Sequence, residues 1–156
     1  MTYRSIAISV CILLAVCATA PAEVYRVDGD VAVSGDGSSW PNAFKTIQEG
    51  IEAADAAGGG EVWVGEAADG YKSATDPVVT LKSGVHIYGG FAGTETLREQ
   101  RDWAAHETII DGGGARRCVY GQDIASGDAT LDGFTMRNGK ATSGAGMYNS
   151  GSSPQV

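Results

Sequence analysis

Short triplets of β-forming residues recur along the chain at a nearly fixed interval. The triplets are 62–64 (VWV), 85–87 (VHI), 108–110 (TII) and 129–131 (ATL). Their third positions are spaced by 23, 23 and 21 residues, and Val156 follows Leu131 by a further 25. A period in the twenties, carried by β-formers and separated by glycine-rich turns, is typical of a solenoid in which each repeat is one coil. We therefore expect the third residues of the four triplets to lie above one another in one hydrophobic column.

An amphipathic helix is predicted immediately before the coils. Four apolar residues share one helical face, namely Phe44, Ile47, Ile51 and Ala54. Asn42 is a suitable N-cap and Gly58 a natural C-terminal stop. A helix laid over the first coil would shield its apolar end and its unpaired strand groups. We therefore assign residues 23–60 to a first strand, a loop and a capping helix, and residues 61–156 to the coils.

The coils are interrupted by one charged excursion, residues 94–107, which leaves the spiral between the second and third triplets. Loops that leave a solenoid at one edge commonly carry binding functions. The pattern predicts about four coils, and the chain stops where a fifth should begin. Because an open last coil exposes its strand edges, we expect this chain to be the amino-terminal fragment of a longer protein.

The amino terminus, residues 1–22, has the pattern of an export signal. Arg4 precedes an apolar run over residues 6–16, and small residues stand before position 23. The run is shorter than the ~20 residues that a membrane-spanning helix needs, which disfavours the alternative of an anchor. A lipoprotein with an acylated Cys17 is a further alternative, but Val16 stands where such a signal needs a small residue. The pattern predicts a secreted protein or one displayed at the cell surface.

The formal charge of −8 disfavours nucleic acid and anionic membrane as partners, because both require clustered Lys and Arg. Such a charge is compatible with calcium, with polycations or simply with solubility. Without residues 1–22 the chain keeps one cysteine, Cys118, so no internal disulfide can form. We prefer a small buried coil residue for Cys118 over a nucleophile activated by His86 or His106.

Two Asp-Gly pairs, at Asp111 and Asp132, are predicted to align in adjacent coils. Their carboxylates would then lie about 4.8 Å apart on one outer face. A calcium ion or the neighbouring Arg137 would relieve the repulsion between them. The alternative, which we prefer, is that Asp-Gly simply makes a good turn at each corner.

Flat aromatic rings suit the apolar face of a sugar, and three aromatic residues are candidates for binding one: Tyr88, Trp103 and Tyr148. Packing is the commoner role for such residues. The sequence has no P-loop, no G-x-S-x-G elbow and no H-E-x-x-H, so nucleotide and zinc chemistry are not expected.

Three stretches carry a resemblance to known proteins: GSSWPNAFKTIQEGIEAADAAGGGEVWV (37–64), VHIYGGFAGTETLREQRDW (85–103) and GFTMRNGKATSGAGMYNS (133–150). The first two resemble the right-handed parallel β-helix superfamily, which has the pectate-lyase-like fold. The third is similar to the repeats of chlamydial-type polymorphic outer membrane proteins. The resemblance implies an all-β solenoid, a right-handed parallel β-helix with an N-terminal amphipathic capping helix.

The resemblance also implies a function. It suggests an exported bacterial protein, free or at the outer-membrane surface, with a structural or adhesive role and a polysaccharide or a host-surface component as partner. The alternative is a calcium-dependent polysaccharide lyase, in which Asp111 and Asp132 would hold the ion and Arg137 or Lys140 would be the base. Neither the ligand nor the oligomeric state follows from the sequence.

Overall fold

The computed structural model describes residues 23–156, so the predicted export signal lies outside the described residues. These residues form three sheets, one α-helix and two short 3-10 helices. Sheet A contains β1 (Val24–Val27), β2 (Gly60–Gly65), β4 (Val85–Phe91) and β7 (Thr130–Asp132). Sheet B contains β5 (Thr108–Asp111) and β8 (Phe134–Arg137). Sheet C contains β3 (Val79–Thr80), β6 (Val119–Gln122) and β9 (Met147–Ser150).

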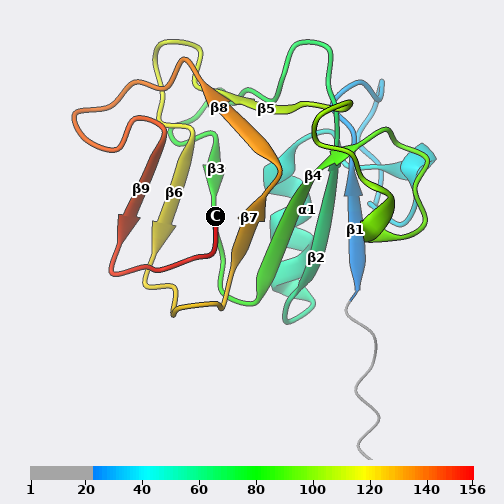
Figure 1. Cartoon of the computed structure of the whole chain (residues 1–156), viewed down its shortest axis with the longest axis horizontal. Coiled ribbons are helices and arrows are strands. Elements are labelled where there is room, and N and C mark those ends of the chain that lie inside the picture. The colour runs from blue at the N-terminus through cyan, green and yellow to red at the C-terminus, as the bar shows by residue number, and fades with distance from the viewer. Residues whose placement is uncertain (1–22) are drawn as a thin grey trace, which may run out of the picture.

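All pairings between these strands are parallel, and each sheet collects strands that are distant in sequence. The chain passes from β4 through β5 to β6, and then repeats the route from β7 through β8 to β9 above it. Figure 1 shows β1, β2, β4 and β7 side by side, with β6 and β9 forming a second row. Mostly parallel strands with one α-helix are consistent with the predicted β-helix-like solenoid.

The predicted column of four aliphatic residues is wrong in two places. Ile87 pairs with Leu131 as expected, but its partner on the other side is Val62 instead of Val64. Ile110 lies in sheet B, where it pairs with Met136. The triplet at 108–110 is therefore the second strand of a coil that β4 opens, and the described chain makes three such passes instead of four coils. All of these side chains still join one buried core.

The next turn of the spiral begins where the period places it. Gln155 forms a parallel bridge with Thr130, one position before Val156 and Leu131. Gly133 makes the corner between β7 and β8 with φ of 81°, in the left-handed region that favours glycine. A Cβ atom there would come within 2.9 Å of the Gly89 carbonyl oxygen, so two stacked corners touch through their backbones.

The amphipathic helix is confirmed as α1 (Ile47–Ala56), and it buries Ile47, Gly50, Ile51 and Ala54. Its N-cap is Thr46 and not Asn42, which lies in the 3-10 helix Trp40–Asn42. Thr46 and Glu49 form a capping box that satisfies two orphan donors of the first turn. Phe44 stands outside the helix and bridges Val27. The buried face packs on β1 and β2, within the apolar core.

Gly50 allows this close approach, because a Cβ atom there would come within 2.8 Å of methyl groups of Val27 and Val62. Within residues 23–156, no helix is long and apolar enough to span a bilayer.

Candidate functional site

The outward face of sheet A carries two rows of polar and aromatic side chains. Alternation along the strands turns Val62, Ile87 and Leu131 into the core. Their neighbours on the other face pair in register as Glu61, His86 and Thr130 in one row, and Trp63, Tyr88 and Asp132 in the next. The ring Nδ1 of His86 lies 3.0 Å from the Thr130 hydroxyl, so the first row is linked by hydrogen bonding.

The excursion at 94–107 brings two arginines onto this face. The 3-10 helix Arg98–Gln100 places the Arg98 guanidinium 4.7 Å from the centre of the Tyr88 ring, and that of Arg101 lies 5.1 Å away. Arg98 Nη1 donates to the Tyr88 hydroxyl at 3.1 Å and to Glu61 Oε1 at 2.8 Å. Tyr88 is thus covered by two cations, an arrangement in which the ring quadrupole attracts positive charge.

Arg101 ties the excursion to the last described strand of sheet A. Its guanidinium forms a close ion pair with the Asp132 carboxylate and also lies 5.3 Å from the centre of the Trp103 ring. The Arg101 side chain is 13% exposed, whereas that of Asp132 is 49% exposed. The arginine is therefore held in place, while the carboxylate keeps an open side toward solvent.

An open cavity of about 610 Å³ lies over this cluster, and we call it the sheet A groove. It is lined by Tyr88, Arg98, Arg101, Thr130, Asp132, Gln155 and Val156. A smaller cavity of about 240 Å³ touches Asp132 from the other side, and Trp103 lines it. Trp103 is 60% exposed, so a large flat ring stands free beside the groove.

The sheet A groove has donors left for an anionic ligand. A guanidinium has five N–H donors, and in Arg98 both recorded hydrogen bonds come from Nη1. Its Nη2 approaches only the exposed Glu99, at 3.7 Å. A carboxylate can therefore bind the remaining edge of Arg98, and bonds of this kind are stronger than neutral ones. The aromatic rings alongside suit the apolar face of a sugar.

Asp111 lies at a different corner of the fold, and the predicted stacking with Asp132 is wrong. Asp111 ends β5 and pairs with Arg137 of β8, whereas Asp132 pairs with Tyr88. The Asp111 carboxylate accepts hydrogen bonds from the Gly113 amide at 2.8 Å, from Asn138 at 3.0 Å and from Arg137 at 3.0 Å. Its two oxygens are already occupied by donors from within the chain.

These contacts explain the electrostatics of the Asp111 corner. The Gly113 amide, followed by Asn138 and Arg137, holds the pKa of Asp111 below its ordinary range, against the opposing effect of burial. Cys118 is buried nearby, as predicted, and burial raises the pKa of its thiol. No group of three or more metal-ligating side chains occurs in the described part of the chain. Asp111 therefore fits a structural role at a turn.

The other candidates are divided among three places: the sheet A groove, the Asp111 corner and sheet C. The structure brings Tyr88, Trp103 and Asp132 together at the sheet A groove. Arg137 and Lys140 lie on the Asp111 side instead, so neither stands beside Asp132. Tyr148 is on sheet C, where its ring stacks on Tyr120 with centroids 6.0 Å apart.

Sequence reasoning missed the two arginines that define the groove. Arg98 and Arg101 are three positions apart in the charged excursion, and that stretch follows directly on the strand that carries Tyr88. Their spacing of three residues could have marked them as a pair of cations on one side of the excursion. Their position over Tyr88 depends on the path of the loop, which no local pattern predicts.

The chain is similar to curated enzymes of Azotobacter vinelandii. It is 36% identical over 110 residues to mannuronan C5-epimerases AlgE1 and AlgE3, and the match covers 67% of this chain. The same stretch covers 7% of AlgE1 and 6% of AlgE3, so the chain spans a small part of these relatives. Mannuronan C5-epimerase AlgE2 matches with the same identity, over 10% of its length. No family model matches the sequence. No solved structure matches it either.

Proposed function

We propose that this chain belongs to an exported protein with a right-handed parallel β-helix, and that it binds an acidic polysaccharide of the polyuronate class in the sheet A groove. One observation carries the proposal: two arginines are stacked on Tyr88 at the edge of an open cavity. The predicted export signal supports an extracellular location, either free or at the outer-membrane surface.

The relatives supply the class of ligand. Their names describe action on mannuronan, a polymer in which every sugar carries a carboxylate. Such a polymer offers anions at regular intervals and sugar rings with apolar faces between them. In the groove, Arg98 supplies donors for a carboxylate, and in the smaller cavity that shares Asp132, Trp103 presents an exposed ring that can stack on a sugar.

The net charge of −8 makes this local arrangement necessary. A polyanion is repelled by an acidic surface as a whole, so binding depends on cations gathered at one place. Salt screens both the general repulsion and the local attraction, over a Debye length of about 10 Å at 0.1 M. We expect a saturable interaction that is confined to the groove and weakened by salt.

Binding without chemistry gives the protein an adhesive or structural role, which is the function that we favour. Chemistry on the same polymer is the second candidate, and the contact between Arg98 and the Tyr88 hydroxyl favours it. In a C5 epimerisation a base takes the C5 proton, the electron pair left at C5 is delocalised into the adjacent carboxylate, and an acid returns a proton to the opposite face. In the groove, water would take the C5 proton, Arg98 would neutralise the carboxylate, and the Tyr88 phenol would donate the returning proton and regain one from solvent.

The lyase hypothesis built on Asp111, Asp132 and Arg137 loses its geometric basis, because Asp111 and Asp132 lie in separate sheets. A single calcium ion held by both of these carboxylates is not compatible with this arrangement.

The test is a calorimetric titration of the full chain with a short oligomannuronate, carried out at low and at high salt. We expect Arg98→Gln to weaken binding about tenfold, the effect of losing about 1.4 kcal/mol from a charge-assisted contact. Arg116→Gln removes the same charge outside the lining of the groove and serves as the matched control. Equal affinities of the two variants would contradict the proposal.

A second measurement separates adhesion from catalysis. The chain is incubated with oligomannuronate in deuterated water, and deuterium at C5 is followed by NMR. Adhesion predicts no incorporation, whereas epimerase chemistry predicts incorporation that disappears in Tyr88→Phe.

A further inference from the structure

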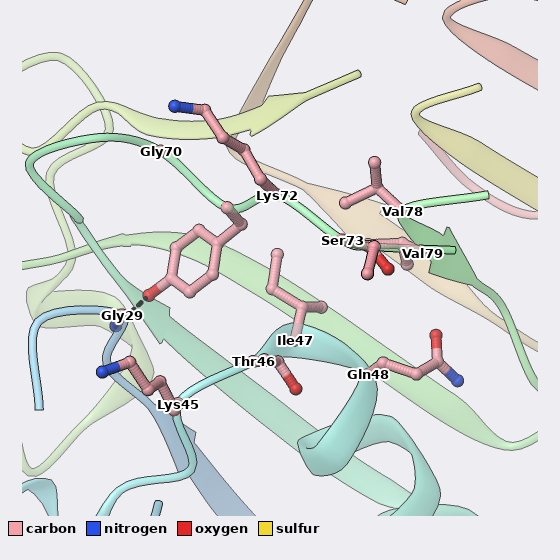
Figure 2. A pocket seen from close by; sticks show the side chains of 12 residues that line it. Gly29, Lys45, Thr46, Ile47, Gln48, Gly70, Lys72, Ser73, Val78 and Val79 are labelled. Atoms are coloured by element: carbon pink, nitrogen blue, oxygen red, sulfur yellow. Dashed lines mark hydrogen bonds between the residues drawn. The ribbon is translucent and has the colours of Figure 1, made fainter. Parts of the chain in front are cut away.

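A second cavity lies on the helix side of the molecule and shares no lining residue with the sheet A groove. It has a volume of about 380 Å³ and lies between the start of α1 and the segment that joins β2 to β3. Figure 2 shows Lys45, Thr46 and Gln48 on the helix side, with Lys72 and Ser73 on the opposite wall. Ile47, Val78 and Val79 supply the apolar part of the lining. We call this space the helix-side cavity.

The lining of the helix-side cavity contains two lysines and no acid, in a chain whose net charge is −8. An adjoining open cavity of about 530 Å³ shares Lys72 and adds Lys140. The only acid that lines this second space is Asp111, whose oxygens already accept bonds from Gly113, Asn138 and Arg137. Three of the four lysines of the chain thus line two cavities that share Lys72.

Most other polar groups of the helix-side cavity already have partners. The buried Tyr71 hydroxyl donates to the Gly65 carbonyl oxygen and accepts from the Gly29 amide, both at 3.0 Å. Gln48 Oε1 accepts from the Thr80 amide at 2.9 Å, and the Ser73 hydroxyl contacts Thr75. These groups shape the cavity but have little capacity left for a ligand.

The two lysines of the helix-side cavity still have N–H donors for a ligand. None of the ion pairs among residues 23–156 involves Lys45 or Lys72. Lys45 Nζ donates once, to the Val31 carbonyl oxygen at 2.8 Å, and an ammonium group has three donors. The free donors of this cavity are therefore cationic, and they stand next to an apolar wall.

From this arrangement we infer that the helix-side cavity binds the carboxylate-bearing ring of an acidic sugar, as a second polysaccharide contact separate from the sheet A groove. The carboxylate binds the exposed Lys72 at the mouth of the cavity, and the ring occupies the space between Lys72 and the start of α1, over a floor closed by the buried Ile47, Val78 and Val79. The volume lies at the lower end of the range of about 300–1,000 Å³ that is usual for small-ligand pockets.

The carboxylate is assigned to the Lys72 end for an electrostatic reason. Asp28 and Asp30 flank Gly29 at the other end, and their charges act on Tyr71. Their carboxylates already accept backbone N–H groups, of Asp30 and of Ala68 respectively. They repel a ligand anion from that end, while Lys72 remains open to it. The inference requires only an acidic sugar as ligand, so it stands or falls independently of the groove.

The experiment is an NMR titration of the full, isotope-labelled chain with oligomannuronate, with neutral mannose oligosaccharides, and with sodium sulfate as separate probes. We expect oligomannuronate to shift the amides of residues 70–73 and of Ile47 as one saturable set. The neutral sugar should leave that set unchanged at the same concentration.

Two lysine variants test the assignment. Lys72→Gln should weaken the saturable change at residues 70–73 about fivefold to tenfold, since it removes a charge-assisted contact. Lys82→Gln is the matched control, because Lys82 is a partly exposed lysine that pairs with Asp55 away from this cavity. We expect Lys82→Gln to change affinity less than about twofold by its effect on overall charge.

Three outcomes would overturn the inference. The first is a titration in which only the amides around Tyr88 and Thr130 shift, which would leave the sheet A groove as the sole site. The second is an equal effect of Lys72→Gln and Lys82→Gln. The third is that sulfate produces the same shifts with equal affinity, which would mean an adventitious ion only. Loss of the shifts around Tyr88 in Arg98→Gln, with those at residues 70–73 intact, would show the two sites to be separate.

Discussion

Two arginine–aspartate pairs in this protein are built in opposite ways, one between neighbouring strands of sheet B and one between the excursion and sheet A. At the Asp111 corner the acid is hidden, with 5% of its side chain exposed, and its partner Arg137 is 44% exposed. At the sheet A groove the arginine is hidden, with 13% of Arg101 exposed, and its partner Asp132 is 49% exposed. The first pair completes a turn, whereas the second borders a cavity. A buried, fully bonded carboxylate supports the fold, and a half-exposed one leaves room for a ligand.

The largest expected difference between the two pairs is in stability. Asp111→Ala leaves the Gly113 amide and the Asn138 side chain without their acceptor, and such partly buried bonds to a charged group contribute about 1.5–3 kcal/mol each. We expect the free energy of unfolding to fall by about 3 kcal/mol. Asp132→Ala removes a carboxylate that is 49% exposed, and the Arg101 guanidinium keeps the Gly89 and Asp132 carbonyl oxygens as acceptors, so we expect a smaller loss of about 1 kcal/mol. Urea denaturation of both variants measures the difference, and equal losses would remove the distinction between the pairs.

A pH titration of stability sharpens the same contrast. The pKa of Asp111 is lowered in the folded state, chiefly by the Gly113 amide. Its ionised form therefore stabilises the fold fully above the ordinary aspartate value of about 3.9, and this contribution is lost as the pH falls through the folded pKa. We expect the stability gap between the natural chain and Asp111→Asn to be constant near neutral pH and to shrink in acid. A gap that stays constant down to pH of about 2 would contradict the assignment.

The smallest expected effect is on oligomannuronate affinity, and it compares a tyrosine at the sheet A groove with a tyrosine on sheet C. Tyr88 lies under both arginines of the groove, whereas Tyr148 stacks on Tyr120 of sheet C and lies under Arg117, which precedes β6. Tyr88→Ala should weaken oligomannuronate binding about fivefold, the effect of roughly 1 kcal/mol from a cation–π contact that positions Arg98. Tyr148→Ala should leave binding within a factor of about two. Calorimetry measures both affinities. A larger effect for Tyr148→Ala would indicate that the ligand binds at sheet C and not at the sheet A groove.

The sequence period predicted a buried position in each triplet correctly but could not assign every strand to its sheet. The triplets at 85–87 and 129–131 do pair, and Gln155 continues the same period. The triplet at 108–110 also consists of β-forming residues at nearly the same spacing, yet it belongs to sheet B. Within one coil, all strands bury the same kind of side chain. The sequence period therefore does not say which of the three sheets a strand joins.

The excursion shows why the groove could not be predicted. Its path is fixed by contacts with residues far away in sequence, such as the Trp40 indole, which donates to the Glu95 carbonyl oxygen at 2.9 Å. The Glu95 carboxylate is held by the amides of Ala92, Gly93 and Thr94. Together these bonds direct Arg98 and Arg101 back over sheet A. Only Tyr88, Trp103 and Asp132 were identified from the sequence.

The sequence alone determined a parallel, glycine-cornered spiral and its amphipathic helix, because periodic burial and local turn chemistry are properties of neighbouring residues. The tertiary structure decided which carboxylate is buried and hydrogen-bonded and which is half-exposed, because that depends on donors brought from other strands. Asp111 and Asp132 are each followed by glycine, so their sequence context does not distinguish them. Three hydrogen bonds to one carboxylate and an open cavity beside the other make them different.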